Sequence, residues 1–120
     1  MGTFVEYGAL QVAAQRQRRS IENLIENTPA DGLVAGIGRI NGDLFDEARS
    51  RCVVMSYDYT VLAGTQGFLN HRKKDRMFEL AEKWRRPVVF FTEGGGGRPG
   101  DTDGVGVAGL DCWAFHFWGR

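Results

Sequence analysis

Hydrophobic and polar positions follow a helical period in two segments of the chain. The first opens at Thr3, where Thr3-Phe4-Val5-Glu6 has the form of a capping box, and its apolar residues keep helical spacing to about Asn27. The second opens near Asn70 and carries its charges on one face. Its apolar face is made by Met77, Leu80, Ala81 and Trp84. The spacing predicts a helix in each segment.

Three shorter apolar runs predict β-strands. Residues 33–40 are apolar apart from two glycines and one arginine, and the turn pair Asn41-Gly42 follows them. Residues 51–59 contain the unbroken apolar run 52–55, and Val88–Phe91 is a second such run. Together with the helix near Asn70, these runs predict the order strand, turn, strand, helix, strand. That order is typical of an α/β fold with a parallel crossover.

The length and composition indicate one small domain that folds in water. The chain has 120 residues and a mass of 13.4 kDa, with 42% hydrophobic and 25% charged residues. It holds no run of ~18 apolar residues and no secretory signal, so we expect neither a membrane span nor secretion. Fifteen basic residues balance fifteen acidic ones, which argues against a nucleic-acid partner.

Cysteine spacing and the last aromatic segment add two further expectations. Cys52 and Cys112 lie sixty positions apart, without companions at metal-ligand spacing. We therefore expect no metal site, reduced thiols and a cytoplasmic location. Residues 109–120 form an aromatic cluster whose period fits a helix and a strand equally. Such an apolar surface predicts either a fragment of a longer protein or a chain that oligomerises there.

Glycine marks the first candidate site. Eight of the 17 glycines lie between Gly94 and Gly109, and the run Gly94-Gly95-Gly96-Gly97 directly follows the last predicted strand. Ligands of open α/β sheets bind at this end of a strand, and glycines let peptide N–H groups approach an oxyanion closely. A flexible surface loop is the alternative. Arg98-Pro99 stands where a phosphate-binding P-loop needs Gly-Lys-Ser/Thr, which argues against a nucleotide triphosphatase.

Other residues near the predicted helix are weaker candidates. A second glycine element, residues 62–67, lies between a strand and that helix, where it either lines a pocket or only turns the chain. His71 opens the helix beside Arg72, Lys73 and Lys74, which either hold an anion or form a solvated face. His116 lies among aromatics and is interpreted as a packing residue. Asp101 and Asp103 are interpreted as either cation ligands or, more simply, turn formers.

Three segments of the chain share their order and spacing with a known family. They are Gly38-Arg39-Ile40-Asn41-Gly42, Tyr57-Asp58-Tyr59-Thr60-Val61-Leu62-Ala63-Gly64-Thr65-Gln66-Gly67, and Arg86-Pro87-Val88 leading into Glu93-Gly94-Gly95-Gly96-Gly97-Arg98. They resemble the N-terminal half of the carboxyltransferase subunits of biotin-dependent acyl-CoA carboxylases, of the acetyl- and propionyl-CoA carboxylase type, which are members of the crotonase-like superfamily. Residues 44–50 then resemble an insertion into the family's tight hairpin.

The resemblance implies an α/β fold, a crotonase-like ββα superhelix, present here as a partial domain. Residues 1–120 would be the N-terminal part of a carboxyltransferase domain, with a helical lead-in over 1–32 and core over 33–120. The family's glycine motif is Ser-Gly-Gly-Ala-Arg. Anchoring it on Arg98 places the glycine pair on Gly95 and Gly96, but its serine and alanine are glycines here, so a register one residue away stays open.

The resemblance also implies a chemistry and its partners. Carboxybiotin, on a separate carrier domain, releases CO2, and the enolate of an acyl-CoA such as acetyl-CoA attacks it. Backbone N–H groups of Gly95 and Gly96 would stabilise the enolate oxygen. Biotin would be held mainly by a C-terminal domain, so the isolated fragment is expected to be inactive. Expected partners are the remainder of the carboxyltransferase, the biotin carboxyl carrier and biotin carboxylase components, and further copies in a homo-oligomer.

We expect the remaining predicted site residues to contact substrate. They are Gly64, Gly67, Gly97, Arg98, His71 and Lys74. Two other function classes stay open at this point. A crotonase-like hydratase, isomerase or decarboxylase would need a positioned carboxylate, for which Glu93 is the local candidate. A non-enzymatic assembly module would use the glycine run as a linker and the C-terminal aromatics as an interface.

Overall fold

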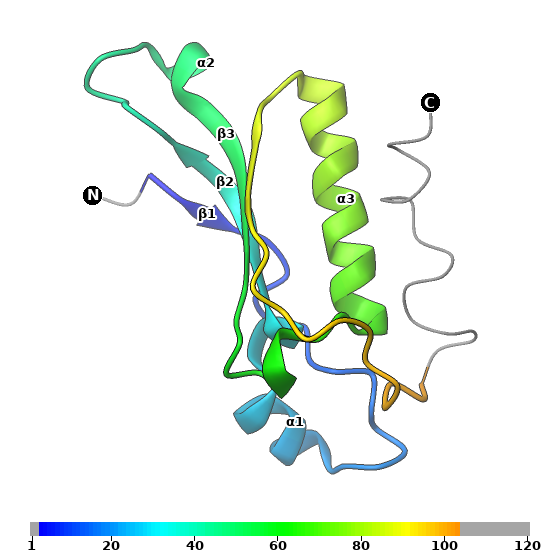
Figure 1. The fold of residues 1–120 in the computed structure, drawn as a ribbon. Coiled ribbons are helices and arrows are strands. Elements are labelled where there is room, and N and C mark those ends of the chain that lie inside the picture. The colour runs from blue at the N-terminus through cyan, green and yellow to red at the C-terminus, as the bar shows by residue number, and fades with distance from the viewer. Residues whose placement is uncertain (1–2, 104–120) are drawn as a thin grey trace.

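A four-stranded sheet with one long helix along its face forms the centre of the molecule (Figure 1). The structure is a computed structural model, and it describes residues 3–103. Its elements are β1 (Val5–Glu6), α1 (Ile21–Asn27), the 3-10 turn η1 (Pro29–Gly32), β2 (Leu33–Arg39), α2 (Glu47–Ser50), β3 (Arg51–Tyr57), the 3-10 turn η2 (Leu62–Gly64), α3 (Phe68–Trp84) and β4 (Val88–Phe91).

The strands lie in the order β1-β2-β3-β4. β2 and β3 are antiparallel, with Leu33 opposite Tyr57 and Arg39 opposite Arg51, so they form a hairpin. β4 lies parallel to β3, and α3 makes the connection between them. The predicted order of strand, turn, strand, helix, strand is confirmed, and it forms one ββα unit followed by a parallel strand.

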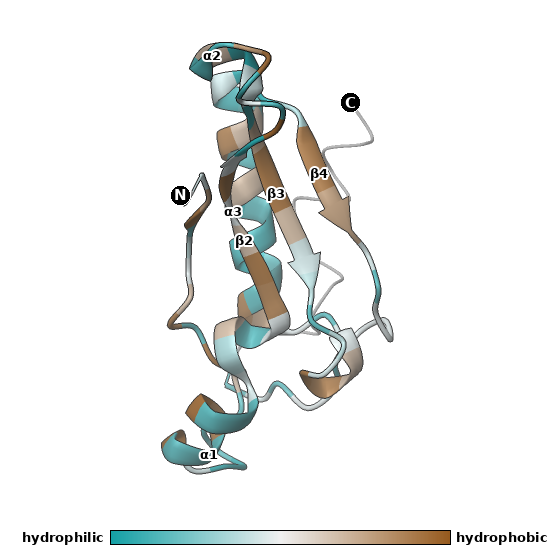
Figure 2. Ribbon diagram, turned by 90° about the vertical axis from the view of Figure 1, so that its left-hand side faces the viewer, coloured by the Kyte–Doolittle hydropathy of each residue, from teal (hydrophilic) through white to brown (hydrophobic). Residues whose placement is uncertain are grey.

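The core lies between α3 and the sheet. Figure 2 shows hydrophobic residues along β2, β3 and β4, and α3 turns its apolar face toward them. The buried core residues are Leu33, Ala35, Val53, Met55, Tyr57, Met77, Leu80 and Ala81. Phe90 of β4 packs its ring 5.3 Å from that of Tyr57, centroid to centroid. Three of the four residues predicted for the apolar face of α3 are therefore in the core, whereas Trp84 is 44% exposed.

The prediction of a helix from Thr3 to Asn27 is wrong for most of its length. Val5 and Glu6 instead form the edge strand β1, opposite Ile37 and Gly36 of β2. A Cβ on Gly36 would overlap the Val5 carbonyl oxygen, so only glycine there lets the two strands approach. The helix α1 begins at Ile21, where the Ser20 hydroxyl accepts a hydrogen bond from the Asn23 N–H at 3.2 Å.

The connection between β2 and β3 contains the predicted insertion. Asn41 adopts a left-handed φ of 54°, which turns the chain out of β2 as its Asn-Gly sequence predicts. The short helix α2 follows, with the Asp46 carboxylate accepting from the Arg49 N–H at 2.8 Å. Residues 44–50 therefore lie in a long connection, and β2 and β3 keep an unbroken antiparallel register.

The elements gather at two opposite ends of the sheet. The carboxyl ends of β3 and β4 lead to the end that holds η2, the start of α3 and α1, whereas α2 and the last turn of α3 lie at the other end (Figure 1). Within residues 3–103, no helix combines the length and apolar character needed to cross a bilayer. The predictions for residues 109–120, Cys112 and His116 lie outside the described residues.

Candidate functional site

Two glycine-containing loops meet at the carboxyl end of β4. A Cβ on Gly64 would lie 2.6 Å from the Glu93 carbonyl oxygen, and one on Gly94 would lie 2.5 Å from the Gly64 carbonyl oxygen. Gly64 also has a φ of +62°, a conformation that favours glycine. Glycine on both sides is therefore what allows the loops to touch. The two glycine elements predicted separately from the sequence form one substructure.

Backbone hydrogen bonds hold these loops in register. The Gly95 N–H donates to the Ala63 carbonyl at 2.9 Å, and the Gln66 N–H donates to the Gly96 carbonyl at 2.7 Å. The Arg98 N–H donates to the Gln66 carbonyl at 2.9 Å, which completes a parallel bridge between Gln66 and Gly97. The glycine run is thus an ordered loop with fixed partners, which argues against the flexible-linker alternative.

Arg98 lies beneath this loop and joins its own segment to those of Asp31 and Thr65. Its side chain is 4% exposed. It donates to the Asp31 carboxylate at 2.5 Å, to the Thr65 hydroxyl and carbonyl at 3.0 Å each, and to the Asp101 carboxylate at 3.4 Å. These acceptors occupy the guanidinium inside the protein, which favours a positioning role for Arg98, whereas the sequence predicts that it contacts substrate.

Asp31 and Asn70 complete the buried network, and both were missed in the sequence. Asp31 is fully buried, and burial raises the pKa of its carboxyl although the neighbouring Arg98 acts in the opposite direction. It accepts from the Asn70 N–H at 2.7 Å, while the Asn70 amide donates to the Asp31 and Thr65 carbonyls. The Asp31-Gly32 pair looks like an ordinary turn, and no local signal marks it as an ion-pair partner 67 residues from Arg98.

The predicted contact residue Gly67 and the acidic pair of the loop have structural roles. A Cβ on Gly67 would overlap the Arg98 guanidinium and the Asp101 carboxylate. Asp101 accepts from the Phe68 N–H at 2.8 Å, and Asp103 accepts from the Arg16 N–H at 2.7 Å. Residues 3–103 contain no cluster of three potential metal ligands, so the cation alternative finds no support there.

The basic start of α3 is mostly buried. His71 is 4% exposed, neither of its ring nitrogens has a partner among the described residues, and burial with the Lys74 charge lowers its pKa to about 4. Lys73 donates to the Ala30 and Leu33 carbonyls at 2.7 Å each, and burial lowers its pKa to about 8. Lys74 donates to the Gln66 side-chain carbonyl at 3.0 Å. Among these side chains, only Arg72 matches the predicted solvated face.

The exposed part of the site is the glycine run itself. Gly95, Gly96 and Gly97 are exposed, whereas Gly64 and Gly67 are buried. The Gly95 N–H is already bonded to Ala63, so it is not available to a ligand. Neither the Gly96 nor the Gly97 N–H has an acceptor among the described residues. Two adjacent peptide donors therefore remain open at the loop surface, which is the arrangement that suits an oxyanion.

This architecture is that of a carboxyl transferase: the family model described as "Carboxyl transferase domain" matches residues 1–111, and the chain belongs to that family. Among individual relatives, the chain is similar to a solved single-chain, multi-domain long-chain acyl-CoA carboxylase, with 65% identity, a TM-score of 0.83, and coverage of 92% of this chain and 11% of that one.

Two further relatives agree with that assignment. The chain is 37% identical over 97 residues to the biotin-dependent acetyl-/propionyl-coenzyme A carboxylase beta5 subunit of Mycobacterium leprae, covering 80% of this chain and 16% of the relative. It is 30% identical to the transcarboxylase 12S hexamer, solved with hydrolysed methylmalonyl-coenzyme A bound, with a TM-score of 0.61 and coverage of 80% and 17%. The predicted crotonase-like α/β fold is confirmed, and the chain spans less than a fifth of these relatives' length.

Proposed function

We propose that the chain supplies the acyl-CoA half of a carboxyltransferase site, in an enzyme that transfers CO2 from carboxybiotin to the α-carbon of an acyl-CoA. The observation that carries the proposal is the pair of open N–H groups at Gly96 and Gly97, on an ordered loop of a chain that belongs to the carboxyl transferase family. The loop by itself could bind many kinds of anion. Among these anions, membership of the carboxyl transferase family supports the enolate of a thioester.

We place the oxyanion donors one residue later than the sequence motif suggests. Gly95 and Gly96 were the predicted pair, but the Gly95 N–H is bonded to the Ala63 carbonyl. Gly96 and Gly97 keep both N–H groups open, and this is the neighbouring register that the replaced serine and alanine left possible. A single preorganised oxyanion donor contributes about 2.7–4 kcal/mol to transition-state stabilisation.

The buried residues of the site position this loop. Arg98 holds the end of the glycine run against Asp31 and Thr65, and Gly64 allows the facing loop to approach. Lys74 reaches Gln66, whose backbone pairs with Gly96 and Arg98. In this proposal Gly64, Gly67, Arg98 and Lys74 set the direction of the donors, and Gly97 touches the substrate.

Biotin enters the proposal as the carboxyl donor on another component. When present, carboxybiotin would supply CO2 for attack by the enolate, and the biotin nitrogen that loses CO2 would take up the α-proton that the acyl-CoA gives up. We assign no residue of the described part of the chain to biotin, because we propose that the thioester oxygen occupies the Gly96 and Gly97 donors. We further propose a biotin carboxyl carrier, a biotin carboxylase and other copies of this chain as partners, in the cytoplasm. The beta5 subunit and the hexameric transcarboxylase among the relatives support an assembly of this kind.

A proline substitution tests the backbone donor directly. Gly97 does not adopt a left-handed φ, so Gly97→Pro avoids the strain of that conformation while it removes the N–H. In a complete carboxyltransferase that carries this sequence, we expect Gly97→Pro to lower kcat by about 10²–10³-fold, as for loss of one oxyanion donor. Gly97→Ala keeps the N–H and is the matched control. Full turnover by the proline variant would contradict the assignment.

A further inference from the structure

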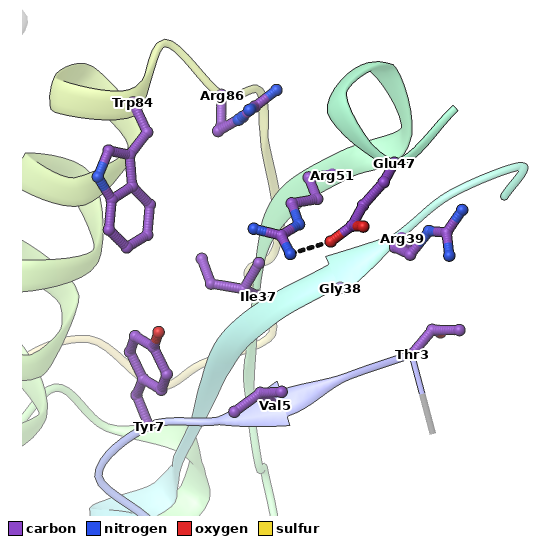
Figure 3. A pocket seen from close by; sticks show the side chains of 10 residues that line it. All are labelled: Thr3, Val5, Tyr7, Ile37, Gly38, Arg39, Glu47, Arg51, Trp84 and Arg86. Atoms are coloured by element: carbon purple, nitrogen blue, oxygen red, sulfur yellow. Dashed lines mark hydrogen bonds and ion pairs between the residues drawn. The ribbon is translucent and has the colours of Figure 1, made fainter. Parts of the chain in front are cut away.

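A cavity lies at the opposite end of the sheet from the glycine loop. It has a volume of about 580 Å³, and we call it the Trp84 pocket. Its ten lining residues come from the N-terminal segment, β2, α2, β3, the end of α3 and the chain after it (Figure 3). They are Thr3, Val5, Tyr7, Ile37, Gly38, Arg39, Glu47, Arg51, Trp84 and Arg86.

One half of the Trp84 pocket is apolar and aromatic. The Trp84 ring points from the end of α3 toward Ile37, and the Tyr7 ring reaches toward the same space from the N-terminal segment (Figure 3). Trp84 is 44% exposed although it shares a helix face with the core residue Met77. The spacing that buries Met77 therefore places the indole beyond the edge of the core. Two aromatic walls around an open space suit a flat apolar body.

The other half of the Trp84 pocket is charged. Arg51 forms an ion pair with Glu47, and its guanidinium points into the space between β2 and Trp84 (Figure 3). The bond to Glu47 uses Nη2, and no described residue accepts from Nε or Nη1. Arg39 donates to the Ser50 hydroxyl at 3.1 Å, and Arg86 donates to the Ala48 carbonyl. The lining contains three arginines and one carboxylate, so its net charge is positive.

We propose that the Trp84 pocket binds a carboxylate carried on a flat aromatic body. Its volume falls within the ~300–1,000 Å³ of typical small-molecule sites, which combine apolar walls with a few placed polar groups. The aromatic body lies between Trp84 and Tyr7, and the carboxylate accepts from the free edge of the Arg51 guanidinium. The site is independent of the proposed carboxyltransfer chemistry, because the length of β3 separates it from the glycine loop.

Removal of the Glu47 charge is predicted to change the ligand affinity in the opposite direction to removal of the Arg51 charge. The Glu47 carboxylate occupies one edge of Arg51 and repels an incoming anion, so it competes with the ligand. Removal of its charge should therefore tighten binding, whereas removal of the Arg51 charge should weaken it. A surface that attracts ligands only through exposed apolar area would respond to neither change.

Calorimetric titration of the 120-residue chain tests the Trp84 pocket, with 2-naphthoate as the probe and its neutral isostere 2-naphthamide as the comparison. We expect saturable binding of 2-naphthoate and at least fivefold weaker binding of the amide. Arg51→Gln should weaken 2-naphthoate at least fivefold, Glu47→Gln should tighten it at least twofold, and Trp84→Ala should abolish it.

Arg49→Gln is the matched control, because Arg49 lies on the same short helix as Glu47, is 71% exposed, pairs with Asp46 and does not line the pocket. It should change the affinity by less than twofold. Equal binding of acid and amide, no saturation by either, or equal effects of the Arg49 and Arg51 variants would each overturn the proposal. Glu47→Gln keeps the test valid if the Arg51 variant folds poorly, since its predicted effect has the opposite sign.

Discussion

Replacement of Arg98 by leucine is predicted to destabilise the fold far more than loss of any surface ion pair. Arg98 and Asp31 have side chains that are 4% and 0% exposed, and their contact is 2.5 Å. Leucine removes the guanidinium but leaves the Asp31 carboxylate buried and without its cationic partner. Breaking a buried pair in this way costs about 3–5 kcal/mol. Loss of the bonds to Thr65 makes the upper part of that range the expectation.

Urea unfolding followed by circular dichroism measures this cost. Arg16→Leu is the control, because Arg16 is 71% exposed and lies 3.7 Å from Asp103. It should lose under about 1 kcal/mol. Asp31→Asn added to Arg98→Leu should recover at least about 1 kcal/mol, since the second change removes the uncompensated charge. An Arg98→Leu cost no larger than that of Arg16→Leu, or no recovery in the double variant, would refute the reasoning.

Burial and backbone geometry lead to three other predictions. The pKa of His71 is about 4 in the folded chain against an ordinary value of 6.5, so the unfolded chain binds more protons between these values, and stability should fall by up to about 3 kcal/mol as pH drops through this window. A His71→Asn variant should show a smaller loss in urea titrations at each pH. Gly94→Ala places a Cβ 2.5 Å from a backbone carbonyl and should cost about 1–3 kcal/mol. Gly96→Ala meets nothing within 4 Å but is strained by its φ of +86°, which should also cost about 1–3 kcal/mol; an unchanged melting temperature in either variant would contradict this. Met55→Ala, at a fully buried site, should cost about 2–5 kcal/mol by chemical denaturation, and the half-exposed Trp84→Ala under half as much.

The strands and the long helix could be predicted because their signals are local. Residues 52–55 form an unbroken apolar run, and Met77, Leu80 and Ala81 recur at helical spacing, so each element carries its burial pattern in consecutive residues. The same reasoning gave a wrong prediction for the N-terminal segment. Its apolar residues also keep helical spacing, but the free edge of β2 and the glycine at position 36 allow Val5 and Glu6 to pair as a strand. A partner outside the segment outweighed its own periodicity.

The candidate site also has features that the sequence could predict and features that it could not. That glycines at positions 94–97 follow an apolar strand was visible in the sequence, and so was the likeness to carboxyltransferases, whereas the partial exposure of that strand, β4, was not. Which N–H groups remain open was not visible. The Gly95 N–H is used by the Ala63 carbonyl, a contact between loops about thirty residues apart. The motif alone predicted the pair Gly95 and Gly96, whereas the loop contacts lead us to propose the pair one residue later.

The sequence by itself determined the elements of the ββα unit, the glycine run and the family, because each depends on residue type and spacing along the chain. Only the tertiary structure decided which side chains are buried together. In the sequence, Arg98 at the end of the glycine run and His71 in the basic start of the helix both look like ligand-binding residues. In the structure, Arg98 is enclosed by Asp31 and Thr65, and His71 is buried and uncharged at neutral pH. The environments of Arg98 and His71 are set by desolvation and by pairing across long sequence separations. Neither effect produces a signal in the neighbouring residues of the sequence.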